Sequence, residues 1–161
     1  YPNMKVLQFA FDPADVGGVS EYAPHNFNNN CFMYTGTHDN ETIHGWFMGM
    51  SKAQKKTIRQ YLSDSFTPDE EMWRKLVDVS MMSVAKTCII PLQDWLGLPN
   101  SARMNTPGTT QNNWTWRLLP GMLTAKLGKE VLIVTKRFGR ANWDALDALA
   151  EKKKAAKIDK V

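Results

Sequence analysis

Three short apolar runs, with helical segments between the second and the third, constrain the fold of this chain most strongly. The runs lie at Met4–Phe11, Cys31–Tyr34 and Thr87–Leu92. Between Thr42 and Lys86, apolar residues recur every three or four positions, which is the spacing of an amphipathic helix. Strands that alternate with helices favour parallel β/α units. The sequence therefore predicts an α/β fold in which the runs form parallel strands.

The small number of strands indicates that the sheet is part of a larger one. Three parallel strands cannot have both of their faces covered by this chain alone, and nothing precedes the first run to cover it. In a TIM (β/α)8 barrel, function lies on the loops at the carboxyl ends of the strands. Polar residues stand there after each run, at Asp12, His38–Asp39 and Gln93–Asp94, although any strand ends in a polar turn. We therefore expect residues 1–161 to be the C-terminal part, about the last three β/α units, of a catalytic TIM barrel.

The helical regions and loops are predicted from periodicity and turn residues. The first helical region spans about 42–62 and the second about 66–86, and a last helical region starts at Trp114. Gly, Pro and Asn mark 12–30 as a loop. The polar loop 98–113 is long for a segment without secondary structure, which indicates a functional or interface segment.

The segment after the second run is the strongest candidate for a site. A buried strand fixes the groups that follow it and the loop exposes them, so His38 and Asp39 stand side by side at its end. Helix capping is the alternative, because Asp39 or Asn40 would be a good N-cap for the next helix. Capping does not require His38, and both interpretations stay open at this point.

A metal site can also be drawn from His38, Asp39, Glu41 and His44. The two histidines are six positions apart, however, whereas paired zinc histidines on a helix are four apart. We therefore expect neither a bound metal nor a cofactor.

The chain is rich in tryptophan, with six tryptophans and nine methionines. Aromatic side chains in polar segments suit sugar rings, but they equally suit a core or a subunit interface. Trp95, Trp114 and Trp116 stand in polar segments, whereas Trp46 and Trp73 fall on helical stripes and are expected in the core. A non-catalytic carbohydrate-binding fragment is therefore an alternative to an enzyme.

Charge, hydropathy and cysteine content bear on partners and compartment. The net charge of +4 rests partly on a basic tail at about 152–161, which we expect to be a solvated tail. No nucleic-acid-binding motif accompanies it, so we expect no nucleic-acid partner. No signal peptide is visible, and no apolar run approaches the roughly 20 residues that span a membrane, so we expect no membrane partner. Cys31 and Cys88 each head an apolar run, so buried reduced thiols in a cytoplasmic protein fit the sequence better than a disulfide framework does.

Four blocks of sequence resemble the 4-alpha-glucanotransferases, which are the amylomaltases or disproportionating enzymes of glycoside hydrolase family 77. The chain carries them in the family's order from about Met4 to Arg117, and beyond Arg117 only general helical character remains. The resemblance is therefore to the C-terminal portion of the family. The blocks are Met4–Asp12, Pro24–Asn26, Tyr34–Thr42 followed by Gly45–Trp46, and several segments within Pro91–Arg117.

The resemblance implies a barrel enzyme that transfers segments of α-1,4-glucan to an acceptor glucose or malto-oligosaccharide with retention of configuration. Retaining chemistry uses one carboxylate as nucleophile and a second carboxyl group, about 5 Å away, as acid and then base. In the family these two groups lie on strands four and five, which precede Met4 in the family's order. The resemblance thus implies that the isolated chain is inactive and that its partner is the missing N-terminal part of the barrel.

The resemblance also implies roles for five residues. It identifies Asp39 as the family's third carboxylate, which binds hydroxyls of the reacting sugar and favours its distorted form, with His38 beside it as a hydroxyl ligand. It places Arg103, Asn105 and Asn113 near the sugar subsites, with Asn113 as the expected direct ligand. For Arg103 and Asn105, pinning of the loop's own backbone stays open as the alternative.

Overall fold

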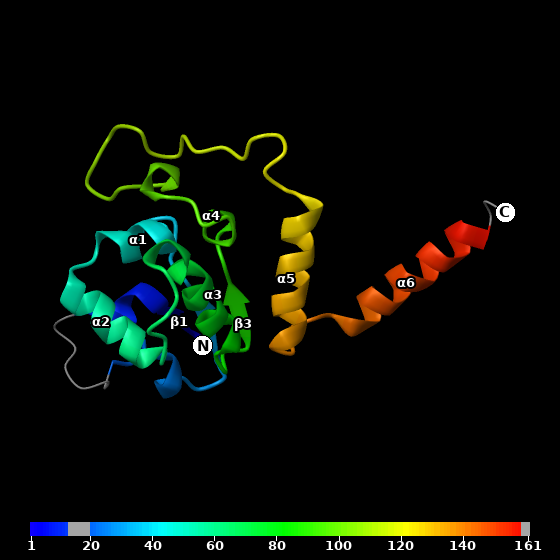
Figure 1. The fold of residues 1–161 in the computed structure, drawn as a ribbon, viewed down its shortest axis with the longest axis horizontal. Helices are drawn as coiled ribbons and strands as arrows, with labels where there is room; N and C mark the ends of the chain where they lie inside the picture. Colours follow the sequence, from blue (N-terminus) through cyan, green and yellow to red (C-terminus); the bar gives the residue numbers. More distant parts are fainter. Residues whose placement is uncertain (13–19, 159–161) are drawn as a thin grey trace. The chain divides into compact units, whose positions relative to one another are not determined.

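The computed structural model describes residues 1–12 and 20–158, with side chains described as far as residue 152 (Figure 1). The described chain divides into two units, one from Tyr1 to Leu123 and one from Thr124 onward, and each is described by itself. Part of the predicted loop at 12–30 and the last residues of the predicted basic tail lie outside the described residues.

The first unit is built on three parallel strands in the order β1-β2-β3. They are β1 (Asn3–Val6), β2 (Cys31–Tyr34) and β3 (Thr87–Ile89). The register pairs Asn3 with Cys31 and Phe32 with Thr87, and both pairings are parallel. The predicted α/β arrangement with parallel strands is therefore confirmed.

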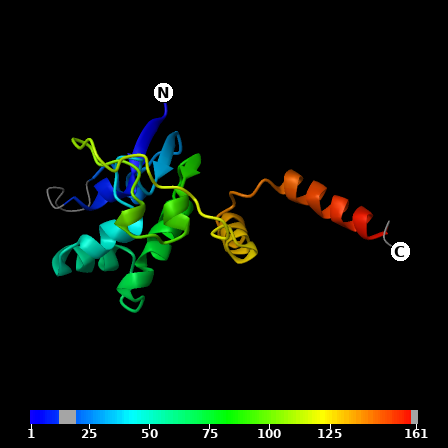
Figure 2. The same ribbon diagram turned by 90° about the horizontal axis from the view of Figure 1, so that it is seen from above.

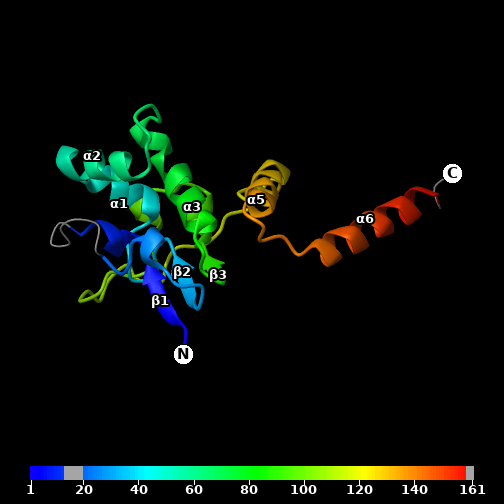
Figure 3. The ribbon, with the colours of Figure 1, turned by 90° about the horizontal axis from the view of Figure 1, so that it is seen from below.

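One face of this sheet is covered by helices, whereas the other, in the part of the chain that the structure describes, is partly exposed. Helices α1 (Ile43–Gly49), α2 (Lys52–Tyr61) and α3 (Met72–Met82) form a layer on one side of the sheet (Figures 2 and 3). Side chains of β2 alternate, so Cys31 and Met33 are buried whereas Phe32 is 36% exposed. The core on the covered side consists of Leu7, Met33, Ile43, Phe47, Ile58, Met72 and Leu76, which are all fully buried.

The first apolar run is only half a strand. The prediction of a strand over Met4–Phe11 is wrong beyond Val6, because Leu7–Phe11 forms the 3₁₀-helix η1. A short apolar run does not by itself distinguish a strand from a buried helical turn. Here a tertiary contact fixes the turn, since Gln8 Nε2 donates a hydrogen bond of 2.8 Å to the Glu41 carbonyl oxygen.

The predicted helical region at 42–62 is two helices, because the chain breaks between α1 and α2. Ser51 is the N-cap of α2 and forms a capping box with Gln54, in which each side chain bonds the other residue's backbone N–H. The Ser-x-x-Gln spacing of a capping box is visible in the sequence and predicts such a start.

The remaining three predicted elements also differ from the structure at their boundaries. The region at 66–86 contains the 3₁₀-helix η3 (Asp69–Glu71) and then α3, and Trp73 is buried as predicted. After β3 come the short helix α4 (Leu92–Trp95) and the 3₁₀-helix η4 (Asn100–Ala102), so the third strand ends before Leu92. No helix starts at Trp114, whose φ of 61° lies in the left-handed region.

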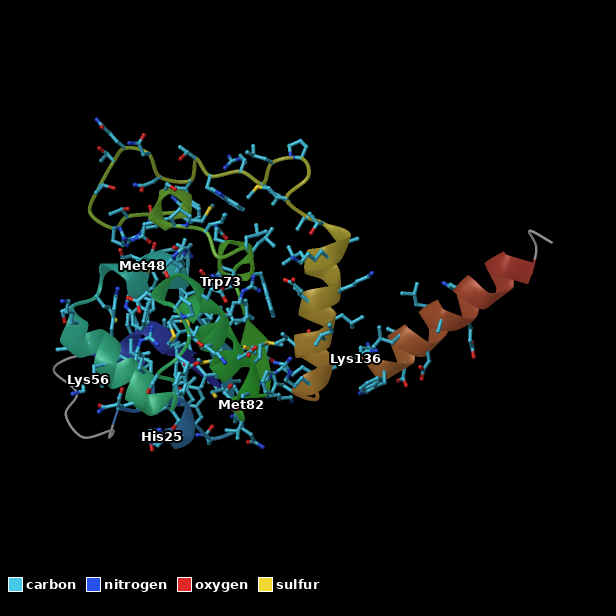
Figure 4. The ribbon with its side chains drawn as sticks, in the orientation of Figure 1. His25, Met48, Lys56, Trp73, Met82 and Lys136 are labelled. Carbon is cyan, nitrogen blue, oxygen red and sulfur yellow. The ribbon has the colours of Figure 1, made fainter. Side chains whose placement is uncertain are left out.

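The second unit consists of α5 (Ala125–Arg137) and α6 (Trp143–Ile158). Thr124 caps α5 by accepting a hydrogen bond of 3.0 Å from the Leu127 backbone N–H. The Nζ atom of Lys136, near the C-terminus of α5, lies 5.3 Å from the centre of the Trp143 ring (Figure 4). The part of the basic tail that is described, 152–158, has a helical backbone. No helix among the described residues has the length and apolar character needed to cross a bilayer.

Candidate functional site

Two polar loops meet beside the carboxyl end of the sheet. The loop after β2, residues 35–42, leads into α1, and the segment after β3 contains α4, η4 and the residues that follow them. The backbone N–H of Asn105 donates a hydrogen bond of 3.0 Å to the His38 carbonyl oxygen and joins the two. Because parallel strands end at the same edge of a sheet, residues far apart in the sequence come together here.

Asp39 lies at the centre of this contact. Its Oδ1 accepts a hydrogen bond of 2.6 Å from Asn105 Nδ2 and lies 3.3 Å from His38 Nε2. Arg103 Nη2 donates a hydrogen bond of 2.6 Å to the Asp39 carbonyl oxygen. Four of the five predicted site residues therefore form one cluster, in which the Asp39 carboxylate is about half exposed.

Arg103 bonds only backbone groups within the described residues. Besides the Asp39 carbonyl, it contacts the carbonyl oxygen of Asn105 through Nε at 2.8 Å. Its guanidinium therefore ties the two loops together, which is the pinning role left open by the sequence.

Asn113 does not join the cluster. Its Oδ1 accepts a hydrogen bond of 2.8 Å from the Thr106 backbone N–H, and its Nδ2 donates to the carbonyl and hydroxyl oxygens of Thr109 at 3.0 Å. These three bonds brace the loop that contains Asn113. A direct contact between Asn113 and a sugar stays a prediction.

Trp114 is absent from the predicted site residues but lies against one of them. Its ring centre is 5.1 Å from that of His38, with a tilted arrangement, and the residue is 50% exposed. Its backbone N–H donates a hydrogen bond of 2.6 Å to the Met104 carbonyl oxygen, which holds the left-handed backbone in place. The sequence signal for Trp114 is an aromatic residue in a polar segment. The same signal marks Trp95 and Trp116, which are half-buried, so it does not by itself identify the exposed ring.

The helix-capping interpretation of Asp39 and Asn40 is wrong. The N-cap of α1 is Thr42, whose Oγ1 accepts a hydrogen bond of 3.1 Å from the Gly45 N–H. Asn40 instead accepts hydrogen bonds from the backbone N–H and hydroxyl of Thr37, at 2.9 and 2.8 Å, and closes the loop on itself. The Asp39 carboxylate is therefore not used as a cap.

Asn100, the first residue of η4, supports the C-terminal side of the loop. Asn100 Oδ1 accepts hydrogen bonds from the Thr42 N–H and hydroxyl at 3.2 and 3.3 Å, and its amide nitrogen donates to the Glu41 carboxylate. A Cβ atom at Gly45 would overlap Asn100 Oδ1, so the helix and the amide meet only because position 45 has no side chain.

A small pocket lies beneath the cluster. Its volume is about 140 Å³, and the residues that line it include Thr37, His38, Glu41, Asp94 and Arg103. Asp94 is 1% exposed, and this burial raises the pKa of its carboxyl group to about 6, although hydrogen bonds from Thr35 and Ile43 favour the ionised form. No group of three or more His, Cys, Asp or Glu residues among those described is arranged to hold a metal ion.

The fold and the cluster together define a parallel α/β protein with a candidate ligand site at the carboxyl ends of its strands. The site is polar, and the exposed ring of Trp114 lies beside it. A sequence profile of glycoside hydrolase family 77, described as 4-alpha-glucanotransferase, matches residues 1–124. The chain belongs to this family.

Individual relatives agree with the profile. The chain is 43% identical over 132 residues to a 4-alpha-glucanotransferase of Thermus thermophilus, and the match covers 79% of this chain and 26% of the relative. It is 40% identical to that of Clostridium butyricum, over 87% of this chain and 28% of the relative. An amylomaltase from Streptococcus agalactiae in complex with acarbose superposes with a TM-score of 0.81 and 34% identity, over 88% of this chain and 28% of that one. The chain thus spans about a quarter of the length of these relatives.

Proposed function

We propose that the chain forms the C-terminal part of a (β/α)8-barrel 4-alpha-glucanotransferase, supplying about its last three β/α units. The proposed reaction transfers a segment of α-1,4-glucan to an acceptor glucose or malto-oligosaccharide with retention of configuration. The observation that carries the proposal is the Asp39 cluster at the carboxyl end of β2, within a segment that matches the transferase family over residues 1–124.

In this proposal Asp39 binds hydroxyl groups of the reacting sugar. Its Oδ1 is oriented by Asn105, and within the residues that the structure describes no donor contacts its Oδ2. A half-exposed carboxylate with one oriented and one available oxygen suits a charge-assisted hydrogen bond to a hydroxyl group. The bond would strengthen as the sugar ring distorts, so Asp39 would act mainly in the transition state.

The surroundings of Asp39 would hold the sugar ring itself. His38 offers a ring nitrogen beside the carboxylate, and Trp114 offers an exposed aromatic face against His38. Sugar rings have an apolar face and a rim of hydroxyl groups, so they suit such a pair of surfaces. We assign Asn105, Arg103 and Asn113 to the support and lining of the same subsites.

The uncovered face of the sheet supports the missing barrel as partner. Met4, Phe32 and Ile89 project from this face with exposures of 54%, 36% and 41%. Strands β1 and β3 each pair with one neighbour only among the described strands. In the proposed barrel these edges and this face meet the preceding strands, which would also supply the nucleophile and the acid/base group.

The proposed substrate is based on one solved structure, and the proposed compartment is based on the two cysteines. The Streptococcus agalactiae amylomaltase is in complex with acarbose, and we propose an α-glucan or malto-oligosaccharide as the ligand of this chain. Neither Cys31 nor Cys88 forms a disulfide within the described residues, which supports a cytoplasmic location. The rice and Arabidopsis relatives are named as chloroplastic or amyloplastic proteins.

A carbohydrate-binding role without catalysis is the second candidate. The exposed Trp114 beside His38 favours it, because stacking on a sugar requires no acid chemistry.

The test uses a completed barrel, in which residues 1–161 replace the matching C-terminal segment of the Thermus thermophilus relative. We expect the completed barrel to disproportionate maltotriose and the isolated chain to show no turnover. A completed barrel that folds and binds acarbose without turnover would instead support the carbohydrate-binding role.

A further inference from the structure

One buried carboxylate joins both ends of the loop that carries His38 and Asp39. Asp94 Oδ2 accepts a hydrogen bond of 2.5 Å from the Thr35 hydroxyl, where the loop leaves β2. Asp94 Oδ1 accepts a hydrogen bond of 2.8 Å from the Ile43 N–H, where the loop enters α1. The side chain of a single residue therefore sets the separation of the two ends.

The three residues of this bridge are enclosed by protein. Asp94 is 1% exposed, and Thr35 and Ile43 are both 0% exposed. Asp94 belongs to α4, which is separated from the end of β3 by two residues, and its backbone N–H donates a hydrogen bond of 3.0 Å to the Pro91 carbonyl oxygen. The Asp94 carboxylate is therefore held close to the sheet by the short helix α4. Hydrogen bonds to a charged group that is shielded from water are strong, so the two bonds to the loop should hold its ends firmly.

The other tethers of the loop do not replace this one. Asn100 and Gln8 both bond the C-terminal end of the loop, at Thr42 and Glu41. Among the described residues, Asp94 alone bonds side chain or backbone groups at both ends of the loop.

We propose that Asp94 is a positioning residue of the transferase, which holds the loop so that the Asp39 carboxylate meets the reacting sugar. The assignment rests on the proposed function. Among the described residues the Asp94 carboxylate is hydrogen-bonded by Thr35 and Ile43 and not by Asp39 or its neighbours in the cluster, so it acts through the loop. A displacement of about 1 Å in a reacting group can cost roughly a hundredfold in rate, so loss of the bridge should lower kcat.

Three variants of the completed barrel separate positioning from general stability. Thr35→Val keeps the side-chain shape and removes only the bond at the start of the loop. Asp94→Ala removes both bonds, whereas Asp94→Asn keeps an oxygen acceptor for the Ile43 N–H and a polar contact with Thr35. The matched control is Asp69→Asn, because Asp69 is bonded by Lys55 and Arg59 of α2 and not by the loop.

Rates of maltotriose disproportionation are measured at a temperature where every variant is folded. We expect Thr35→Val and Asp94→Ala to lower kcat by about tenfold or more with KM changed by less than about threefold, and Asp94→Asn to recover most of the loss. The Asp69→Asn variant should melt earlier and keep the parental kcat.

The assignment is overturned if Thr35→Val and Asp94→Ala keep the kcat of the Asp69→Asn control. If Asp94→Ala does not fold, the kcat of Thr35→Val decides the question alone. An inactive parent would instead overturn the proposed function, and the positioning role would fall with it.

Discussion

Asn105 and Asp39 join the two loops of the candidate site side chain to side chain, with Asn105 Nδ2 donating a hydrogen bond of 2.6 Å to Asp39 Oδ1. The amide has a second hydrogen and the carboxylate a second oxygen, so the pair presents a donor and an acceptor in adjacent positions. Vicinal hydroxyl groups of a sugar both donate and accept, and they match such a pair.

Substitution of Asp39 by Asn should abolish most of the activity of the completed barrel. The isosteric amide keeps the shape but loses the charge, and loss of a charge-assisted bond in the transition state lowers kcat by roughly a hundredfold or more. Folding should be normal, since Thr42 and not Asp39 caps α1. Maltotriose disproportionation and a thermal melt are measured on the same sample. The charge control is Glu70→Gln, on an exposed residue of η3, and parental kcat in Asp39→Asn would contradict the proposed role.

Substitution of Asn105 by Ala should act on catalysis as well as on loop order. The variant removes the donor that orients Asp39 Oδ1, while the backbone bond from Asn105 to His38 remains. We expect kcat to fall by about tenfold, less than for Asp39→Asn, because the carboxylate itself remains. Equal kcat in the parent and the variant would show that Asn105 only pins the loop.

Substitution of Asn113 by Ala distinguishes a ligand from a brace. Three hydrogen bonds within the loop are lost, so limited proteolysis between Thr106 and Asn113 should be faster than in the parent. The melting temperature should change little, because the loop is exposed. If the KM for an acceptor sugar rises without faster proteolysis, Asn113 is the direct ligand that the sequence predicts.

The stability of the completed barrel should depend on pH through Asp94. Burial raises the pKa of this carboxyl to about 6, compared with about 3.9 for an exposed aspartate. Between these values the folded state holds a proton that the unfolded state has released, so stability falls as the pH rises through this window and is level above it. From about pH 4 to about pH 7, the parent should therefore lose stability relative to the Asp94→Asn variant, and its melting temperature should fall relative to that of the variant. The loss in the free energy of unfolding is roughly 3 kcal/mol at most.

This difference isolates Asp94 from its charged neighbours. His38, Glu41 and Arg103 line the same pocket and are present in both proteins. Hydrogen bonds from Arg59 and Lys55 lower the pKa of Asp69, so its contribution is lost as the pH falls and has the opposite sign. A pH-independent difference between parent and variant would show that Asp94 titrates in its ordinary range.

The isolated chain should self-associate through the uncovered face of its sheet. Met4 and Ile89 are 54% and 41% exposed, and β1 and β3 have open edges among the described strands. We expect binding of an apolar dye and a mass above that of the monomer by light scattering. Ile89→Lys should reduce both, whereas Leu119→Lys, at an exposed residue outside the sheet, should not. A dye-free monomer with a cooperative melt would contradict this expectation.

The sequence predicts the parts of this fold that depend on local pattern. The short apolar run Cys31–Tyr34 and the helical spacing after it predict a parallel β/α unit, which the structure contains. The polar residues at the end of this strand predict that the candidate site lies at His38 and Asp39. The break before α2 was not predicted, although its signal is local, since Ser51 and Gln54 have the spacing of a capping box.

Other features depend on contacts that no local pattern contains. Residues Leu7–Phe11 form a 3₁₀-helix, in which the Gln8 side chain bonds the Glu41 carbonyl oxygen. The left-handed backbone at Trp114 is held by the hydrogen bond from its N–H to the Met104 carbonyl oxygen. The tether from Asp94 to Thr35 joins residues 59 positions apart. Asp94 is visible in the sequence only as a polar residue after a strand, so neither its burial nor its partners could be predicted.

The close approach of Gly45 to Asn100 has a consequence for sequence variation. Any side chain at position 45 would occupy the space of the Asn100 amide, whose oxygen overlaps the position that a Cβ atom would take. A side chain at position 45 therefore forces the Asn100 amide away and breaks its hydrogen bonds to Thr42 and Glu41, unless Asn100 changes as well. A randomised library that varies both codons together should yield folded combinations that neither single-site library contains, and the substitution Gly45→Ala should recur together with replacement of Asn100 by a smaller residue.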